Sequence, residues 1–371
     1  MIKSLILSIL CFQLAFHVTT TSERIWPEGE WIQKPLMDAG LNTKIFGQLL
    51  RYLFFSKQDF QTNSFVVIKD GYLIYERYAN GFRKGQPQRA WSVTKSVTNA
   101  LIGIGIHKGY LNLEQSVGKF VKDFQGVQRS ALTINHLMRM SSGLSWKEGY
   151  EYDPFSSDVI AMLYTTHFQN MASRPGSKEF EFQPGTKFRY SSGETNLLIH
   201  AFRQALPVSI YDDFPWKELF DPLGITTATW ERDAAGTFVG SSYLFISPED
   251  LGRIGLLFLR NGVWKDRRLL PEDWVKYSTE PAPAFAKTTL KGKANCQSYG
   301  AQWWLNKPTP EKNCTRPYPD GPENVYLASG HHGQNLIIMP NQNIILVRNG
   351  ADRKARIDIN LVLKYIMESL Q

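Results

Sequence analysis

Residues 89–106 read RAWSVTKSVTNALIGIGI, and the interpretation of the whole chain starts from this stretch. From Val93 to Ile106 small and apolar residues dominate without a charged stripe, which is typical of a helix inside a domain. Lys95 is the exception, because a lysine is rarely buried without a partner and burial lowers its pKa towards the range where it accepts protons. Ser92 lies one helical turn earlier, so both side chains are predicted to share a face. A serine beside such a base is a candidate nucleophile.

This spacing of serine and lysine is weak by itself. Ser116 and Lys119 have it as well, in a polar segment where an exposed pair is the expected structure. For Ser92 the alternative is an N-cap serine followed by a solvated Lys95. The apolar run after Ser92 favours the buried pair.

The composition is that of an ordinary globular protein. The chain has 371 residues, 43% hydrophobic and 20% charged, which is enough for one large domain or two smaller ones. The net charge of +8 comes from scattered Lys and Arg, so we expect no nucleic-acid partner and infer only a favourable field for anions. The sequence contains neither a His-Glu-x-x-His pattern nor a Gly-x-Ser-x-Gly elbow. We expect no metal and no cofactor.

The first residues predict a signal peptide over residues 1–21. Met1-Ile2-Lys3 provides a positive start, and an apolar run follows from Ser4 to Phe16. The run is too short to span a bilayer comfortably, so no stable membrane span is expected after the signal is removed. An uncleaved anchor is the alternative. The sequence therefore predicts export to the periplasm or secretion.

Two cysteines remain in the mature chain, Cys296 and Cys314, in one polar region that contains prolines. In an oxidising compartment we expect them to form a disulfide. Two free thiols are the alternative.

Periodicity and capping signals predict the elements. Helices are expected over residues 41–55, 92–106, 133–137, 158–164, 194–205, 248–260 and 351–370. Strands are expected over residues 64–69, 72–78, 238–240, 243–246, 299–305, 335–339 and 344–348. Asp70-Gly71 and Pro340-Asn341-Gln342 are expected to turn two hairpins. Strands at both ends with helices between them predict an α/β (α+β) fold, with a sheet domain from residues 22–110 and 231–371 and an inserted, mainly helical domain from residues 111–230.

Tyr190 is the first of two further candidates for the site. It precedes a predicted helix that Ser191 caps, with Glu194 completing a capping box. A phenol there can act as a general acid or base if a neighbouring cation lowers its pKa. The alternative is a tyrosine that only packs at the helix entry.

The second candidate is the segment ASGHHGQ, residues 328–334, before the last hairpin. Glycines on either side of His331 and His332 let a strand edge approach a ligand, and the backbone N–H of Gln334 could form an oxyanion hole with that of Ser92. Because neighbours on a strand point to opposite faces, at most one histidine is expected to face the site. The alternative is a pair of loop histidines beside a bulge.

Taken in order, three segments resemble the motifs of the serine β-lactamase and penicillin-binding protein superfamily: Ser92-Val93-Thr94-Lys95, Tyr190-Ser191-Ser192 and His331-His332-Gly333. The likeness is strongest to the class C β-lactamase-like branch, which also holds family VIII esterases, D-alanyl-D-alanine peptidases and 6-aminohexanoate-dimer hydrolases. The resemblance implies a β-lactamase/transpeptidase-like fold, with an antiparallel sheet flanked by helices. It implies that an amide or ester acylates Ser92 while Lys95 and Tyr190 move the proton. The residues expected to bind substrate or its oxyanion are Ser92, Ser192, His331, His332, Gly333 and Gln334.

The chain departs from this family at two motif positions. Ser192 stands where the second motif usually ends in Asn. His331-His332 stands where true β-lactamases have Lys followed by Thr or Ser, which removes the fixed cation that holds a β-lactam carboxylate. Efficient penicillin hydrolysis is therefore not expected. The context of Ser92, of residues 190–194 and of residues 302–304 inclines towards the 6-aminohexanoate-hydrolase-like subgroup.

The sequence thus predicts an exported serine hydrolase that cleaves an amide or ester bond of a small or peptide-like substrate. A D-Ala-D-Ala peptidase, a weak β-lactamase and a carboxylesterase are the alternatives among enzymes. The alternative that is not an enzyme is a catalytically silent binding protein of the same fold. The oligomeric state is left open.

Overall fold

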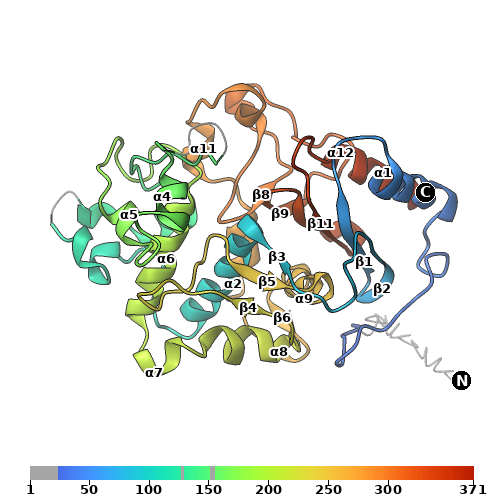
Figure 1. Cartoon of the computed structure of the whole chain (residues 1–371), viewed down its shortest axis with the longest axis horizontal. Coiled ribbons are helices and arrows are strands. Elements are labelled where there is room, and N and C mark those ends of the chain that lie inside the picture. The colour runs from blue at the N-terminus through green and yellow to red at the C-terminus, as the bar shows by residue number, and fades with distance from the viewer. Residues whose placement is uncertain (1–23, 127–128, 151–154) are drawn as a thin grey trace, which may run out of the picture.

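The computed structural model describes residues 24–126, 129–150 and 155–371 (Figure 1). The predicted signal peptide, residues 1–21, lies outside the described residues. Within the described part, the helices are all too short or too polar to cross a bilayer.

Six antiparallel strands form the main sheet, in the order β2-β1-β11-β10-β9-β8. The strands are β1 Thr62–Lys69, β2 Tyr72–Tyr78, β8 Trp304–Leu305, β9 Tyr326–Gly330, β10 Gln334–Met339 and β11 Ile344–Gly350. The run Phe65–Ile68 is buried throughout, as expected where both faces of a sheet are covered. Val66 of β1 pairs with Val347 of β11, so the two ends of the chain share one sheet, as the sequence predicts.

Both predicted hairpins form. Asp70 and Gly71 join β1 to β2 with φ angles of 55° and 90°, and a tight turn with two positive φ angles is what Asp-Gly favours. Pro340–Gln342 forms a single helical turn between β10 and β11, and Asn343 follows it with φ 51°.

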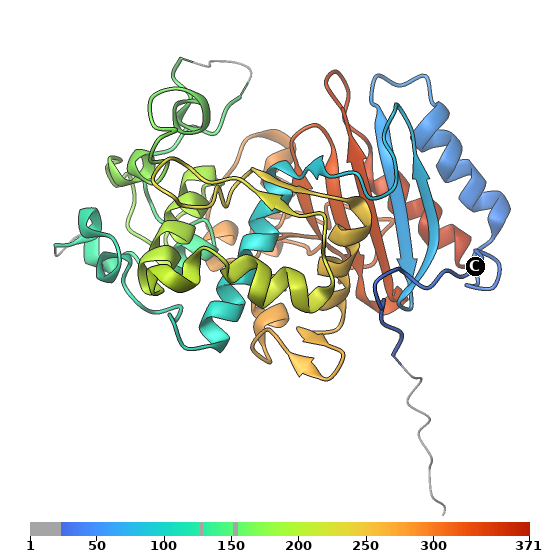
Figure 2. The ribbon, with the colours of Figure 1, turned by 60° about the horizontal axis from the view of Figure 1, so that its bottom comes forward.

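Helices cover both faces of the sheet. Helix α1 (Thr43–Phe55) lies beside α12 (Ile359–Ser369) on one face, and α9 (Pro248–Leu259) packs on the other (Figures 1 and 2). The predicted caps are confirmed, since the Asn42 side chain accepts hydrogen bonds at the start of α1 and Ser247 does so at the start of α9.

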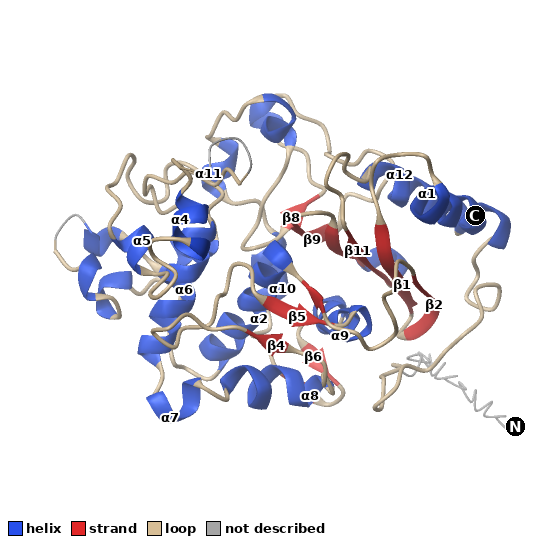
Figure 3. Cartoon of the chain, viewed as in Figure 1, coloured by secondary structure: helices blue, strands red, loops and turns tan. Residues whose placement is uncertain are grey.

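Helix α2 (Thr94–His107) runs through the interior and follows a 3₁₀ turn, Trp91–Val93. All its residues from 94 to 105 are buried, which confirms the prediction of an interior helix. The other helices are α3 Ile134–Met138, α4 Asp158–Tyr164, α5 Ser173–Gly176, α6 Ser192–Ala205, α7 Val208–Tyr211, α8 Asp221–Leu223, α10 Trp274–Thr279 and α11 Pro283–Ala286. Short strands complete the fold: β3 Gln88–Arg89, β4 Thr229–Trp230, β5 Leu244–Ile246, β6 Val263–Trp264 and β7 Arg267–Arg268. Figure 3 shows α1, α9 and α12 beside the strands of the main sheet, and α4, α5, α6 and α7 with loops on the opposite side.

Two predicted strands differ from the structure. Within residues 299–305 only Trp304–Leu305 is a strand, because Gln302 has a φ of 62° that turns the chain. Phe238 forms a single bridge with Arg232, and residues 238–240 are otherwise irregular.

The predicted C-terminal helix over residues 351–370 is too long. The helix in the structure, α12, begins at Ile359, and the Asp358 side chain caps its first turn. Residues before it are irregular because Asp352 turns inward to pair with Arg348.

The largest apolar cluster crosses the predicted domain boundary. It includes Val66 from β1, Ile102 from α2, Leu198 from α6 and Phe220 from the segment before α8. The sheet region and the region of residues 111–230 therefore share a core around α2.

Candidate active site

Ser92 and Lys95 lie together at the start of α2. Lys95 is 1% exposed, and its Nζ lies 3.0 Å from Ser92 Oγ. The N-cap position belongs to Val93, which makes no side-chain capping bond. An N-cap serine with a solvated lysine is therefore not what the structure contains, whereas Lys119 of the other motif is exposed as expected.

Two further oxygens surround the Lys95 amine. Its Nζ lies 3.0 Å from Ser192 Oγ and 3.1 Å from the Ser241 carbonyl oxygen. Burial lowers the pKa of Lys95 to about 8, and the negative charge of Glu148 opposes that shift. About a tenth of Lys95 is thus neutral at pH 7, and this neutral form can accept a proton.

Tyr190 completes the cluster. Its ring lies 5.0 Å from Lys95 Nζ and stacks on Trp304, with the ring centroids 5.4 Å apart. Burial, followed by the charge of Glu148, raises the pKa of Tyr190, while a hydrogen bond with Ser92 acts in the opposite direction. The condition of a pKa lowered by a neighbouring cation is therefore not met, because the loss of hydration raises the pKa. Tyr190 is a neutral phenol bonded to Ser92, which is more than a packing role.

Glu148 is a residue of the site that sequence reasoning missed. Its carboxylate accepts hydrogen bonds from the Ser192 backbone N–H at 2.8 Å, from Ser192 Oγ at 2.5 Å and from Trp146 Nε1 at 2.5 Å. Ser192 thus connects Lys95 to Glu148. The segment around Glu148 is irregular, so no periodic pattern marks it in the sequence.

The predicted capping box at α6 is only half present. Ser191 Oγ accepts the Glu194 backbone N–H at 3.0 Å, as expected. The Glu194 carboxyl instead meets the hydroxyl of Ser142 at 2.7 Å and its backbone N–H at 3.2 Å. Burial raises the pKa of Glu194 to about 8. Glu194 therefore anchors the Ser142 turn beside the site.

The turn between β9 and β10 lies against the Ser92 turn. A Cβ built on Gly330 would lie 2.6 Å from the Ala90 carbonyl oxygen, so only glycine permits this approach. The next residues, His331 and His332, have ring centroids 5.2 and 5.9 Å from that of Trp91. Both histidines lie in a turn rather than on a strand, as in the alternative of loop histidines, so the alternation of strand neighbours does not apply to them.

His331, Gly333 and Gln334 have different surroundings. The His331 ring stacks on Tyr150 at 5.0 Å, which adds a second missed residue to the site. Gly333 has φ 81°, and its carbonyl oxygen accepts a hydrogen bond from Arg348. The same guanidinium forms an ion pair with Asp352. The Gln334 side chain is buried and donates to the Gly350 carbonyl at 2.8 Å, and its backbone pairs with Gly330 across β9 and β10.

A pocket of about 580 Å³ opens beside Tyr190. Its lining residues are Phe182, Lys187, Phe188, Arg189, Tyr190, Thr288, Thr289, Leu290, Ala294, Gln297 and Trp304. Cys296 and Cys314 form the predicted disulfide next to it. This volume lies within the range of small-molecule sites, about 300–1,000 Å³.

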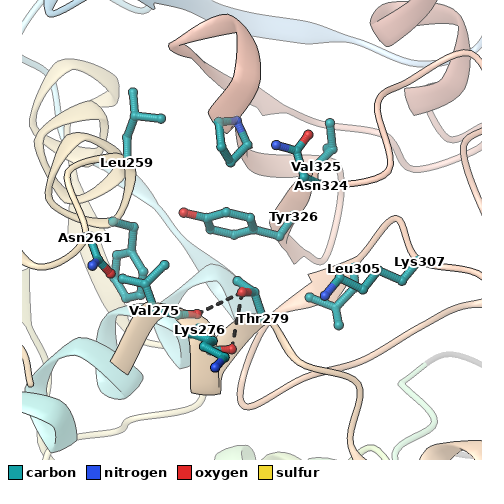
Figure 4. Close-up of a pocket in the computed structure, with 12 residues that line it drawn as sticks. Leu259, Asn261, Val275, Lys276, Thr279, Leu305, Lys307, Asn324, Val325 and Tyr326 are labelled. Atoms are coloured by element: carbon teal, nitrogen blue, oxygen red, sulfur yellow. Dashed lines mark hydrogen bonds between the residues drawn. The ribbon is translucent and has the colours of Figure 1, made fainter. Parts of the chain in front are cut away.

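A smaller pocket of about 330 Å³ lies between α9, α10 and β9, with Tyr326 and Lys276 in its lining (Figure 4). None of the predicted site residues lines it. Among the described residues no group of three His, Cys, Asp or Glu side chains could hold a metal ion.

The six-stranded antiparallel sheet, flanked by helices and joined to a helical region through α2, is the β-lactamase/transpeptidase-like fold. The chain belongs to the Beta-lactamase family, whose model matches residues 39–356, and is a hydrolase of that family. The resemblance read from the three motifs is thereby confirmed.

Similar proteins are found by sequence and by structure. A 6-aminohexanoate-dimer hydrolase of Paenarthrobacter ureafaciens is 24% identical over 301 residues, covering 77% of this chain and 72% of that protein. A Bacillus anthracis protein assigned as a 6-aminohexanoate-dimer hydrolase has a TM-score of 0.70 at 21% identity, covering 93% of this chain and 88% of its own. A class C β-lactamase has a TM-score of 0.62 at 14% identity, covering 89% of this chain and 97% of its own.

Proposed function

We propose that this protein is a serine hydrolase that cleaves an amide or ester bond through an acyl-enzyme on Ser92. The observation that carries the proposal is the 3.0 Å separation of Ser92 Oγ from the buried Lys95 amine, whose pKa is lowered to about 8 by burial. A hydroxyl is a weak nucleophile until a neighbouring base takes its proton, and this amine is such a base.

The proposed reaction starts with neutral Lys95. The amine takes the Ser92 proton as Oγ bonds to the substrate carbonyl carbon, and the carbonyl π electrons move to oxygen. The backbone N–H groups of Ser92 and Gln334 stabilise that oxyanion. The tetrahedral intermediate then collapses, and Tyr190 donates its proton to the departing nitrogen or oxygen. Lys95 returns the first proton to Tyr190. Water then attacks the acyl-enzyme and gives a proton to the Lys95–Tyr190 pair, which returns a proton to Ser92 Oγ as the acyl group departs.

The proposed substrate is a small or peptide-like amide or ester without the fixed carboxylate of a β-lactam. His331 and His332 face Trp91 where true β-lactamases have a lysine, so the cation for that carboxylate is missing from the motif. The name of the relative from Paenarthrobacter ureafaciens, a 6-aminohexanoate-dimer hydrolase, supports an amide substrate.

We also propose that the protein is exported to the periplasm or secreted. The apolar run after Met1-Ile2-Lys3 supports this location. The bond between Cys296 and Cys314 supports it as well, because such bonds persist in oxidising compartments.

The test is hydrolysis of 4-nitrophenyl hexanoate and of N-hexanoyl-4-nitroaniline. Ser92→Ala should lower kcat/KM for both by at least about 10³-fold while leaving the far-UV circular dichroism unchanged. Ser116→Ala is the matched control, because Ser116 belongs to the second Ser-x-x-Lys spacing and only caps a short turn. Full activity of the Ser92→Ala protein would rule out the proposed nucleophile. Absence of any Ser92-dependent turnover would favour a silent binding protein.

A further inference from the structure

The smaller pocket, between α9, α10 and β9, is separate from the residues proposed to act in hydrolysis (Figure 4). None of Ser92, Lys95 and Tyr190 lines it. Its volume of about 330 Å³ is at the lower end of the range for small-molecule sites, about 300–1,000 Å³. The kind of molecule that fits this pocket is therefore set by its own lining.

A buried hydroxyl without a partner belongs to this lining. Tyr326 is 3% exposed, and its Oη has no hydrogen-bond partner among the described residues. Figure 4 shows the hydroxyl pointing into the space between Leu259 and Val275. Burial raises the pKa of Tyr326 above its ordinary value, so the hydroxyl keeps its proton. Because an unpaired buried hydroxyl costs the folded protein free energy, a bound acceptor at this oxygen would stabilise the protein.

A single water molecule is the other partner that this hydroxyl could have. A buried water needs about two to four polar contacts, and the side chains beside the hydroxyl in Figure 4, Leu259 and Val275, offer none. Thr279 also lines the pocket, but its hydroxyl already donates to the Val275 carbonyl oxygen at 2.8 Å. The surroundings therefore favour a ligand that brings an apolar body together with its acceptor.

Most of the lining is apolar. Six side chains from α9, α10, β8 and the segments next to β9 and β10 form these walls: Phe258, Leu259, Val275, Leu305, Val325 and Pro340. The Trp303 ring packs against the rings of both Phe258 and Tyr326, with centroids 4.7 and 5.2 Å apart. The walls are thus part of the packed core, and the pocket exists before a ligand binds.

The charged groups of the lining are cationic. Lys276 and Lys307 line the pocket, and no acidic side chain does. Lys307 is half-buried and Lys276 is exposed, and neither forms an ion pair within the described part of the chain. A lysine amine on its flexible stem can reach a group bound nearby. Together with the Tyr326 hydroxyl, these amines offer donors to a carboxylate, which only accepts hydrogen bonds.

We propose that this pocket is a second small-molecule site, which binds a short aliphatic chain or an aromatic ring that ends in a carboxylate. The carboxylate accepts a hydrogen bond from Tyr326 and is attracted by Lys307, while the chain or ring covers the apolar walls. This site does not depend on the proposed hydrolysis, because the two sets of residues are separate.

Isothermal titration calorimetry with 3-phenylpropionate tests the site, and 3-phenylpropan-1-ol is the uncharged comparison ligand. The native protein should bind one molecule of the acid, and the alcohol at least about fivefold more weakly. Tyr326→Phe should raise the Kd of the acid at least about tenfold, because it removes only the unpaired hydroxyl. Lys307→Gln should raise it about threefold, as expected for a partly exposed ion pair. Lys187→Gln is the matched control, because Lys187 lines the pocket beside Tyr190.

Each outcome supports or overturns the site. A Kd that rises in Tyr326→Phe and not in Lys187→Gln supports it, provided that far-UV circular dichroism shows the Tyr326→Phe protein to be folded. No binding of the acid at millimolar concentration, or an equal Kd in Tyr326→Phe, would overturn it and leave water as the partner of the hydroxyl. Binding that is lost in Lys187→Gln would also overturn it, because the acid would then occupy the pocket beside Tyr190. Equal affinity for the alcohol would overturn the assignment of a carboxylate.

Discussion

The Lys95 amine lies in the interior of the protein, 1% exposed, with Ser92, Ser192 and Ser241 oxygens around it. The sequence predicts this residue well, because a lone lysine in a run of small and apolar residues does not fit a solvated helix face. It also predicts Tyr190 as a member of the site. It does not predict the direction of the pKa of Tyr190, which depends on how completely the folded protein removes water from the phenol.

The first prediction concerns pH. Burial lowers the pKa of Lys95 to about 8, and only the neutral amine can accept the Ser92 proton. We therefore expect kcat/KM for 4-nitrophenyl hexanoate to rise with pH through about 8 and to fall by about tenfold for each pH unit well below it. A profile that is flat between about pH 6 and 9 would contradict the role of Lys95 as the base.

Glu148 shows what the sequence leaves out at this scale. Its carboxylate reaches Ser192 and Trp146 from an irregular segment, and only the fold brings that segment to α6. No spacing rule connects Glu148 to the three motifs.

The second prediction follows from the charge of Glu148. This charge raises the pKa of Lys95 against the effect of burial, so Glu148→Gln should lower that pKa further. The rise of kcat/KM should then occur at lower pH than in the native protein. Glu179→Gln is the control, since Glu179 is exposed and paired with Arg129. A rise that stays in place or moves to higher pH would contradict this assignment.

At the scale of elements, sequence periodicity places the buried strands and the long helices correctly, because their cores repeat with a clear period. It fails where a side chain redirects the backbone, as at Gln302 and Asp352. It also places the two histidines on a strand, although the turn between β9 and β10 holds them. These details depend on tertiary contacts that local patterns do not encode.

The third prediction concerns this turn. Gly333 has φ 81°, and a Cβ there would collide with Asp352 and Arg348. Gly333→Ala should lower the free energy of unfolding by at least about 2 kcal/mol, from backbone strain and from disturbance of a buried ion pair. Gly40→Ala is the matched control, because Gly40 has φ 77° but nothing within 4 Å of its Cβ position. Urea unfolding measures both, and equal losses would show that the ion pair is not disturbed.

At the scale of the whole molecule, the prediction of two domains, residues 22–110 with 231–371 and residues 111–230, remains a prediction. The strand and helix content of each part follows from the sequence. The way in which the two parts pack together does not follow from the sequence, because it depends on contacts of single side chains. The Gln302 amide donates to the carbonyls of Leu137 and Met138 and accepts from Thr195, so it ties the β8 region to α3 and α6.

The fourth prediction concerns cooperativity. Because one apolar cluster contains residues of both parts, we expect a single thermal transition, with tryptophan fluorescence and far-UV circular dichroism changing together. Gln302→Ala should lower the midpoint by leaving two carbonyls and the Thr195 hydroxyl without this partner. Two separate transitions in the native protein would show that the parts unfold independently.

Whether Lys95 activates Ser92 is best decided by intact-protein mass spectrometry after exposure to a fluorophosphonate, which labels activated serines. We predict one adduct on the native protein, located on the peptide that contains Ser92. We predict the same adduct on Ser116→Ala and none on Ser92→Ala. No adduct on correctly folded native protein, or an adduct that persists in Ser92→Ala, would contradict the activation of Ser92 by Lys95.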